Sequence, residues 1–225
     1  MGTRSVREMK LVGGHPALDL VNTIAPRTDD DDQRDYLAAP DDLLTFCGLA
    51  GLADAQELAM VGSAWQASPK AAMRALTAVR DIREALYAVL VAYLHPSADG
   101  GAPDGELAHL SLAWTAAASR SRLVFGGDKA RAGDPAALWV SGAPPDLLLQ
   151  DRAAVAAVNL LTSVDATRLG SCEPDAGGCG WLFLDHTRNR SRRWCTMEDC
   201  GAEVKSRRLT ERRRAGRASK QPTAG

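Results

Sequence analysis

Four cysteines near the C-terminal end of the chain have the spacing of a metal site. Six, fifteen and four residues separate the successive positions Cys172, Cys179, Cys195 and Cys200. Zinc in structural sites prefers a tetrahedral shell of thiolates, and two short-spaced pairs are a common way to supply it. A closed shell of four sulfurs leaves no coordination position for water or substrate. We therefore expect one structural Zn²⁺ ion that organises the surrounding chain and does not catalyse.

Disulfide bonds or incidental clustering are the alternatives for these cysteines. The opening MGTRSVREMKLVGG has charges and no apolar run of signal-peptide length, and no later stretch has the roughly 18 apolar residues of a membrane span. This pattern predicts a cytoplasmic protein with no membrane partner, in which clustered cysteines favour metal over disulfides. The fifth cysteine, Cys47, is expected to be a small core residue.

The residues between the two cysteine pairs predict a hairpin. GWLFLD has the composition of a strand, HTRNRS that of a turn, and RRWC that of a returning strand. Trp181 and Phe183 would share one face of the first strand, where we expect them to pack a small core. His186 falls at the proposed turn, so we expect it to face solvent and not to replace a cysteine as ligand.

A basic segment follows the last cysteine. Residues 1–171 hold 15 Lys and Arg against 21 Asp and Glu, whereas residues 172–225 hold 12 against 7. The segment GAEVKSRRLTERRRAGR tolerates a helix with cations around most of its circumference, which suits a polyanion or, alternatively, a solvated surface. The expected nucleic-acid contacts are Arg188, Arg190, Arg192, Arg193, Lys205, Arg207, Arg208, Arg212, Arg213 and Arg214.

The elements that precede the cysteines predict a mainly helical domain. Apolar residues at three- and four-residue steps predict a long core-facing helix over 69–94, on the face of Met73, Leu76, Val79, Ile82, Leu86, Leu90 and Tyr93. Further helices are expected over 16–24, 42–49, 54–66, 106–119 and 146–164. Short β-like runs at 122–125 and 137–140 predict a small hairpin.

Two polar residues in PALDLVNT are the candidates for a ligand site. Asp19 and Asn22 are three residues apart and would share a helix face, where they could contact a small-molecule effector. Alternatively, they satisfy backbone groups or a neighbouring arginine. The sequence has no Gly-rich phosphate loop, nucleophile elbow or zinc-protease motif, so we do not expect an enzyme.

Two segments of the sequence resemble a known family. The cysteine pairs flanking GWLFLDHTRNRSRRWC, followed by CG and a basic helix, resemble the CGNR-type zinc-finger proteins, and GGHPALDLVNT resembles the opening of the ABATE domain that precedes this finger. The resemblance implies a treble-clef-like finger with the four cysteines as zinc ligands, in a bacterial, stress-related transcription regulator. The expected fold class is α+β: an ABATE-like domain over 1–168, the finger with its basic helix over 169–214, and a disordered tail over 215–225.

The sequence departs from the family pattern in two places. The first cysteine pair encloses six residues, CEPDAGGC, where a shorter knuckle is expected, and Gly177 and Gly178 look like an insertion that a loop could absorb. Ala202 and Glu203 stand where the family continues with Asn-Arg after Cys-Gly, which removes one cation and adds an anion at the start of the helix.

Taken together, these features predict a DNA-binding transcription regulator. The zinc module would present its cations to DNA, and the N-terminal domain would sense an effector or form a homo-oligomer. The two alternatives are a zinc-dependent protein-interaction module and an RNA-binding protein, for which a preference for single strands would be expected.

Overall fold

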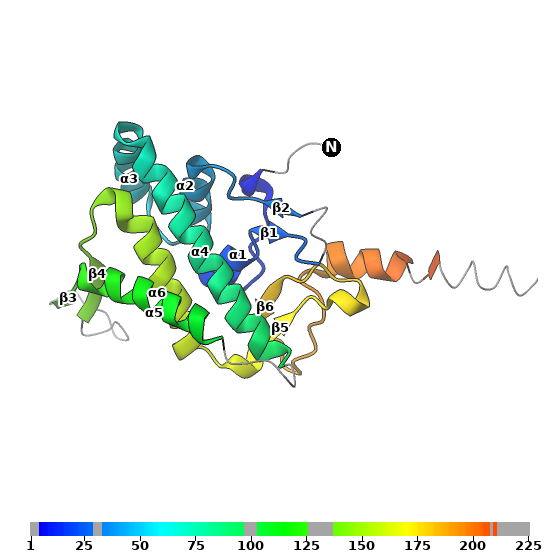
Figure 1. Ribbon diagram of the computed structural model, residues 1–225. Coiled ribbons are helices and arrows are strands. Elements are labelled where there is room, and N and C mark those ends of the chain that lie inside the picture. The colour runs from blue at the N-terminus through cyan, green and yellow to red at the C-terminus, as the bar shows by residue number, and fades with distance from the viewer. Residues whose placement is uncertain (1–4, 29–32, 97–102, 126–136, 208, 211–225) are drawn as a thin grey trace, which may run out of the picture.

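Six α-helices form the N-terminal body in the computed structural model, which describes residues 5–28, 33–96, 103–125, 137–207 and 209–210 (Figure 1). These helices are α1 (Pro16–Val21), α2 (Pro40–Leu49), α3 (Ala55–Ala67), α4 (Pro69–Leu94), α5 (Asp104–Ser119) and α6 (Leu148–Ser163). Three antiparallel pairs of strands accompany them: β1 (Ile24–Ala25) with β2 (Arg34–Asp35), β3 (Ser121–Phe125) with β4 (Ala137–Ser141), and β5 (Leu169–Ser171) with β6 (Leu182–Leu184). The expected α+β class, with a mainly helical domain and a small hairpin, is confirmed.

Helix α4 is the central element of this body. It begins at Pro69, and proline suits the first turn because the N–H that it lacks would have no partner there. The helix packs against α1, α2, α3, α5 and α6. Its inward face is the expected one except at Met73, which is 50% exposed, and Tyr93, which is also exposed. Ala72 and Ala75 take the inward positions near Met73, so the other helices approach closely over small side chains.

Strand β6 is shared by two hydrophobic cores. Leu182 and Leu184 belong to the main core with the helices, whereas Phe183, the next residue between them, lies in a second core with Trp181 and Trp194. Alternation of side chains along a strand explains this division. The expected packing of Trp181 and Phe183 is therefore confirmed, and β6 contributes side chains to both the zinc-site core and the core of the N-terminal body.

The expected return strand at residues 192–195 is wrong. Strand β6 pairs instead with the preceding β5, with Phe183 opposite Gly170. Its other edge is already occupied, because the backbone of Leu184 donates to the carbonyl oxygen of Gly13 at 2.8 Å. The chain after β6 therefore turns away, and the Asp185 carboxylate accepts the backbone N–H of Arg192 at 2.8 Å.

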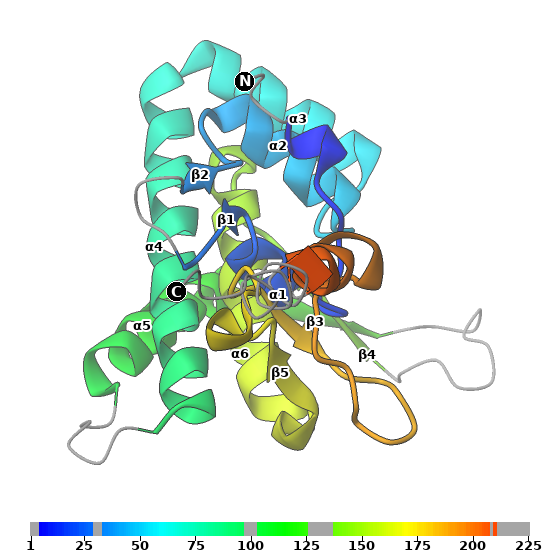
Figure 2. The ribbon, with the colours of Figure 1, turned by 90° about the vertical axis from the view of Figure 1, so that its right-hand side faces the viewer.

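A π-helical turn (Met197–Gly201) leads into an α-helix over 202–207 that projects from the body (Figure 1). Figure 2 views the molecule from that side, with this helix pointing toward the viewer and the loop after β6 extending to one side. Among the residues that the structure describes, no helix is long and apolar enough to cross a membrane.

Candidate metal centre

The four cysteines converge as the spacing predicted. Their sulfur atoms all lie within 4.8 Å of one another, and the Sγ atom of Cys195 is 3.6 Å from that of Cys179 and 3.4 Å from that of Cys200. A tetrahedron with Zn–S bonds of about 2.3 Å has sulfur–sulfur edges of about 3.8 Å. The sulfur positions therefore fit one zinc ion, and the four cysteines can bind it.

A bound cation would also favour ionisation of the four thiols. Hydrogen bonding from Cys179 lowers the pKa of the Cys172 thiol, and the same bond to Cys172 raises the pKa of Cys179. One thiolate is thus stabilised by protons that remain on its neighbours, since like charges this close disfavour one another. A divalent cation would remove that conflict and hold all four groups as thiolates, which is the chemistry of a structural zinc site.

The loop of the first cysteine pair is compact although it is long. Residues Pro174–Ala176 form one 3-10 turn, and Gly177 adopts a left-handed backbone with φ of +90°. A Cβ atom on Gly178 would lie 2.6 Å from the carbonyl oxygen of Cys172, so only glycine fits there. The two glycines that resemble an insertion therefore close the knuckle around the metal ligands.

The second cysteine pair encloses the π-helical turn. The Thr196 hydroxyl accepts the backbone N–H of Asp199 at 3.1 Å, which caps the turn. Asp199 in turn accepts a hydrogen bond from the Lys10 ammonium at 2.6 Å, which ties the turn to the N-terminal segment. The helix over 202–207 follows directly, so its base is fixed by the Cys200 ligand.

Asp19 and Asn22 hold the finger to the body. The Asn22 amide donates to the carbonyl oxygen of Leu182 at 2.8 Å and accepts the Leu182 N–H at 2.9 Å. The Asp19 carboxylate accepts the N–H of Gly13 at 2.8 Å, and Gly13 in turn accepts from Leu184. Burial raises the pKa of Asp19. Asp19 lies in α1 and Asn22 caps its C-terminal end, so Asn22 binds β6 directly and Asp19 binds Gly13, which pairs with β6.

Two further contacts across this junction were not predicted from the sequence. The Trp181 indole donates to the carbonyl oxygen of Ile24 at 2.8 Å. The backbone N–H of Arg27 donates to the carbonyl oxygen of Cys179, also at 2.8 Å. The Arg27 guanidinium also binds Glu84 on α4 at 2.6 Å. A metal ligand is thus connected through one residue to the central helix, and no local sequence pattern indicates this.

The cations proposed for nucleic acid have different surroundings. Arg192 packs over the Phe183 ring at 4.0 Å and donates to the carbonyl oxygens of Val12, at 2.9 Å, and Cys195, at 2.6 Å. Its guanidinium therefore joins the N-terminal segment to the finger, unlike the exposed cations around it. Arg190 donates to the Thr167 hydroxyl at 2.7 Å.

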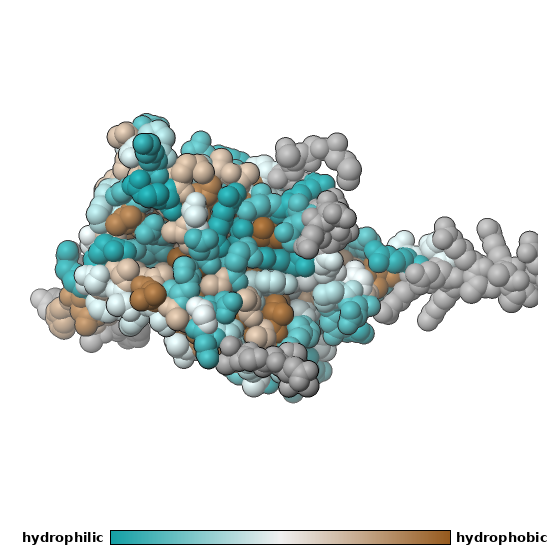
Figure 3. Space-filling model, in the orientation of Figure 1, coloured by the Kyte–Doolittle hydropathy of each residue, from teal (hydrophilic) through white to brown (hydrophobic). Residues whose placement is uncertain are grey.

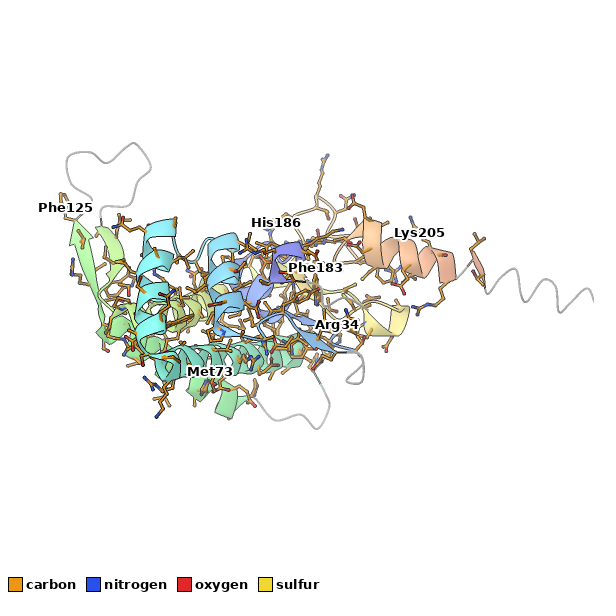
Figure 4. All side chains as sticks on the ribbon, turned by 90° about the horizontal axis from the view of Figure 1, so that it is seen from above. Arg34, Met73, Phe125, Phe183, His186 and Lys205 are labelled. Atoms are coloured by element: carbon orange, nitrogen blue, oxygen red, sulfur yellow. The ribbon has the colours of Figure 1, made fainter. Side chains whose placement is uncertain are left out.

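The remaining cations lie on the outer surface of the finger. Arg188 and Arg193 are exposed on the loop after β6, and Arg193 pairs with Glu173 at 3.4 Å. Lys205 and Arg207 are exposed on the projecting helix, and Figure 4 shows the place of Lys205 on it. The predicted contacts Arg208, Arg212, Arg213 and Arg214 lie outside the described residues.

A groove of about 420 Å³ adjoins the metal centre on this surface. Trp194 and Met197 supply its apolar lining, and the side chains of Thr187, Ser191 and Arg193 supply polar groups. A groove lined by apolar, hydroxyl and cationic groups can accommodate a sugar–phosphate chain or a polar peptide.

Two family models match the chain in the order that the motifs indicated. Residues 14–164 match the ABATE model, described as "Putative stress-induced transcription regulator", and residues 168–213 match the CGNR zinc finger. No curated protein matches the chain. The first match covers more than half of the sequence and the second contains all four clustered cysteines, so the chain belongs to the ABATE family and carries a CGNR zinc finger at its C-terminal end.

Proposed function

We propose that the chain is a cytoplasmic transcription regulator, without catalytic activity, that binds DNA through its zinc finger. The observation that carries the proposal is the helix over 202–207, which begins immediately after the Cys200 ligand and projects from the body with Lys205 and Arg207 exposed. The sequence continues from there with Arg208, Arg212, Arg213 and Arg214. Cations on a rigidly based helix can neutralise phosphates along a duplex.

The exposed loop cations extend this surface. Arg188 and Arg193 lie on the chain between the metal ligands, and Arg193 lines the groove beside Cys195. A phosphate bound in this groove could also contact the Thr187 and Ser191 hydroxyls, which line it. Recognition of a particular DNA sequence would require contacts to base edges, for which arginine is well suited.

The N-terminal body would influence the position of the finger through the contacts that join the two. A ligand or second copy that shifts α1 would also shift β6, because Asn22, which caps α1, binds both the N–H and the carbonyl oxygen of Leu182. This supports a sensing or self-association role for the body, in which a small-molecule effector bound there would act on the finger.

Binding of the zinc-loaded full chain to duplex DNA, duplex RNA, single strands and acidic peptides tests the proposal. We expect the tightest binding to duplex DNA, with Arg207→Ala weakening it and the charge-matched Arg74→Ala on α4 leaving it unchanged. A preference for single-stranded RNA would support the RNA-binding alternative. Binding to acidic peptides without affinity for DNA would support the protein-interaction alternative.

A further inference from the structure

Helix α5 and the ribbon β3–β4 together form an exposed surface with very little charge. From Leu107 to Ser119 the sequence has no Asp, Glu, Lys or Arg, and the ribbon strands contain one, Arg122. Yet only Leu110 and Ala117 of α5 are buried. A helix with a solvent-facing side normally places charged residues there, and a helix that is apolar all round is normally covered.

The ribbon exposes large apolar side chains on both of its faces. Leu123, Phe125 and Trp139 lie on one face and Val124, Leu138 and Val140 on the other, because the paired strands alternate. Phe125 is 77% exposed and Leu112, on α5, is 72% exposed. Figure 3 shows brown side chains gathered where the ribbon leaves the body. A two-stranded ribbon of this kind is marginally stable unless something packs on it.

We infer that this surface is covered by a second copy of the chain, in a two-fold dimer in which each ribbon packs on α5 of its partner. Nucleic acid and charged peptides are poor occupants, because the surface offers them almost no charge. A second copy suits it, because each molecule carries both a helix that needs cover and a ribbon that can supply it. In a two-fold arrangement the same contact forms twice.

The dimensions of the two elements agree with this arrangement. The 16 residues of α5 extend about 24 Å, and the five-residue strands of the ribbon, which begins next to the C-terminal end of α5, are about 17 Å long. The ribbon is therefore long enough to cross the partner's α5, since a helix with its side chains is about 10–12 Å wide. The two aromatic rings of the ribbon, Phe125 and Trp139, supply part of the roughly 800 Å² per partner of a stable interface, and the exposed leucines of the patch, Leu112, Leu123 and Leu138, add to it.

The dimer surface is remote from the proposed nucleic-acid surface. Figure 4 shows Phe125 and Lys205 at opposite ends of the molecule. Self-association through α5 and the ribbon would thus leave the finger accessible, and its test does not depend on whether the finger binds DNA.

Sedimentation of the zinc-loaded full chain with interface variants tests the inference. We expect a dimer for the natural sequence. Leu112→Glu on α5 and Phe125→Glu on the ribbon should each raise the dimer Kd at least about 30-fold, the effect of removing one strongly contributing interface side chain. The matched control is Met73→Glu, on α4 outside the patch, which should leave the Kd unchanged. Zinc content and circular dichroism establish that the variants are folded.

Mixing the two variants tests the ribbon-on-helix arrangement itself. A mixed dimer regains one natural contact, between the ribbon of the Leu112→Glu chain and α5 of the Phe125→Glu chain. The mixture should therefore dimerise more tightly than either variant alone. A monomeric natural protein, a dimer that neither variant weakens, or a mixture no tighter than the single variants would each overturn the inference.

Discussion

The side-chain amide of Asn22 binds the backbone of Leu182 as a neighbouring strand would. It donates to the Leu182 carbonyl oxygen at 2.8 Å and accepts from the Leu182 N–H at 2.9 Å, and Asn22 is fully buried. Since Leu182 also contributes to the main core, this contact joins the finger and the helical body. The two should therefore unfold together, although family models match them as separate segments.

Replacement of Asn22 by leucine should destabilise both parts at once. The change leaves the buried N–H and carbonyl groups of Leu182 without partners, at a cost of about 1–3 kcal/mol for each. Chemical denaturation monitored by helical circular dichroism and by tryptophan fluorescence gives the free energy of unfolding. Asn159→Leu is the control, because the Asn159 side chain is exposed and its one hydrogen bond among the described residues is to the His15 ring at the surface. Equal stability of the two variants would contradict the proposed junction.

Zinc removal should disrupt the small core and weaken the body. Structural zinc supplies on the order of 10–16 kcal/mol in modules of this kind, and the second core consists largely of cysteine and tryptophan side chains. A chelator should shift the emission of Trp181 and Trp194 to longer wavelength and lower the Tm of the helical signal. Added Zn²⁺ should restore both. A helical transition at an unchanged temperature would show that the body folds independently.

Arg192 and Arg193 should differ although they are adjacent. The Arg192 guanidinium donates to several carbonyl oxygens, including that of Cys195 at 2.6 Å, whereas Arg193 pairs with Glu173 at the surface. A single lysine ammonium cannot reach all the carbonyl oxygens that the three nitrogens of the Arg192 guanidinium contact. We expect Arg192→Lys to cost about 2–3 kcal/mol of stability and Arg193→Lys to be close to neutral. Thermal unfolding of the two zinc-loaded variants measures the difference, and the opposite order would refute these roles.

Glu203 should weaken the proposed DNA contact. Its carboxylate lies 3.2 Å from the Arg207 guanidinium, one helical turn away, at the position where the family pattern has a cation. Glu203→Gln removes an anion from the binding surface and releases Arg207. The affinity for duplex DNA at fixed salt should then rise about twofold to fivefold, the effect of a surface pair. Asp81→Asn, on α4, provides the same charge change away from the finger. If both variants raise the affinity equally, the effect is one of net charge alone.

Local patterns in the sequence predicted the helices and the metal ligands. The three- and four-residue steps of 69–94 indicate α4, and the cysteine spacing indicates the metal centre, because both depend on short stretches of chain. The conformation of residues 192–195, expected as a return strand, could not be predicted from local patterns. The place of such a strand beside β6 is taken by Asn22 and Gly13, which are far away in the sequence. The inward role of Arg192 was missed for the same reason, since its partner Val12 lies near the N-terminus.

The salt dependence of DNA binding tests the proposed function most directly. For the zinc-loaded full chain, the logarithm of the affinity should fall linearly with the logarithm of the salt concentration. Replacing Arg212, Arg213 and Arg214 by alanine should make that slope shallower by about 0.9 for each phosphate that the variant no longer neutralises. The control replaces Arg7, Lys70 and Arg74, three exposed cations of the body, by alanine. We expect the control to keep the natural slope. Equal slopes for the natural protein and the Arg212–Arg214 variant would contradict DNA binding through the finger.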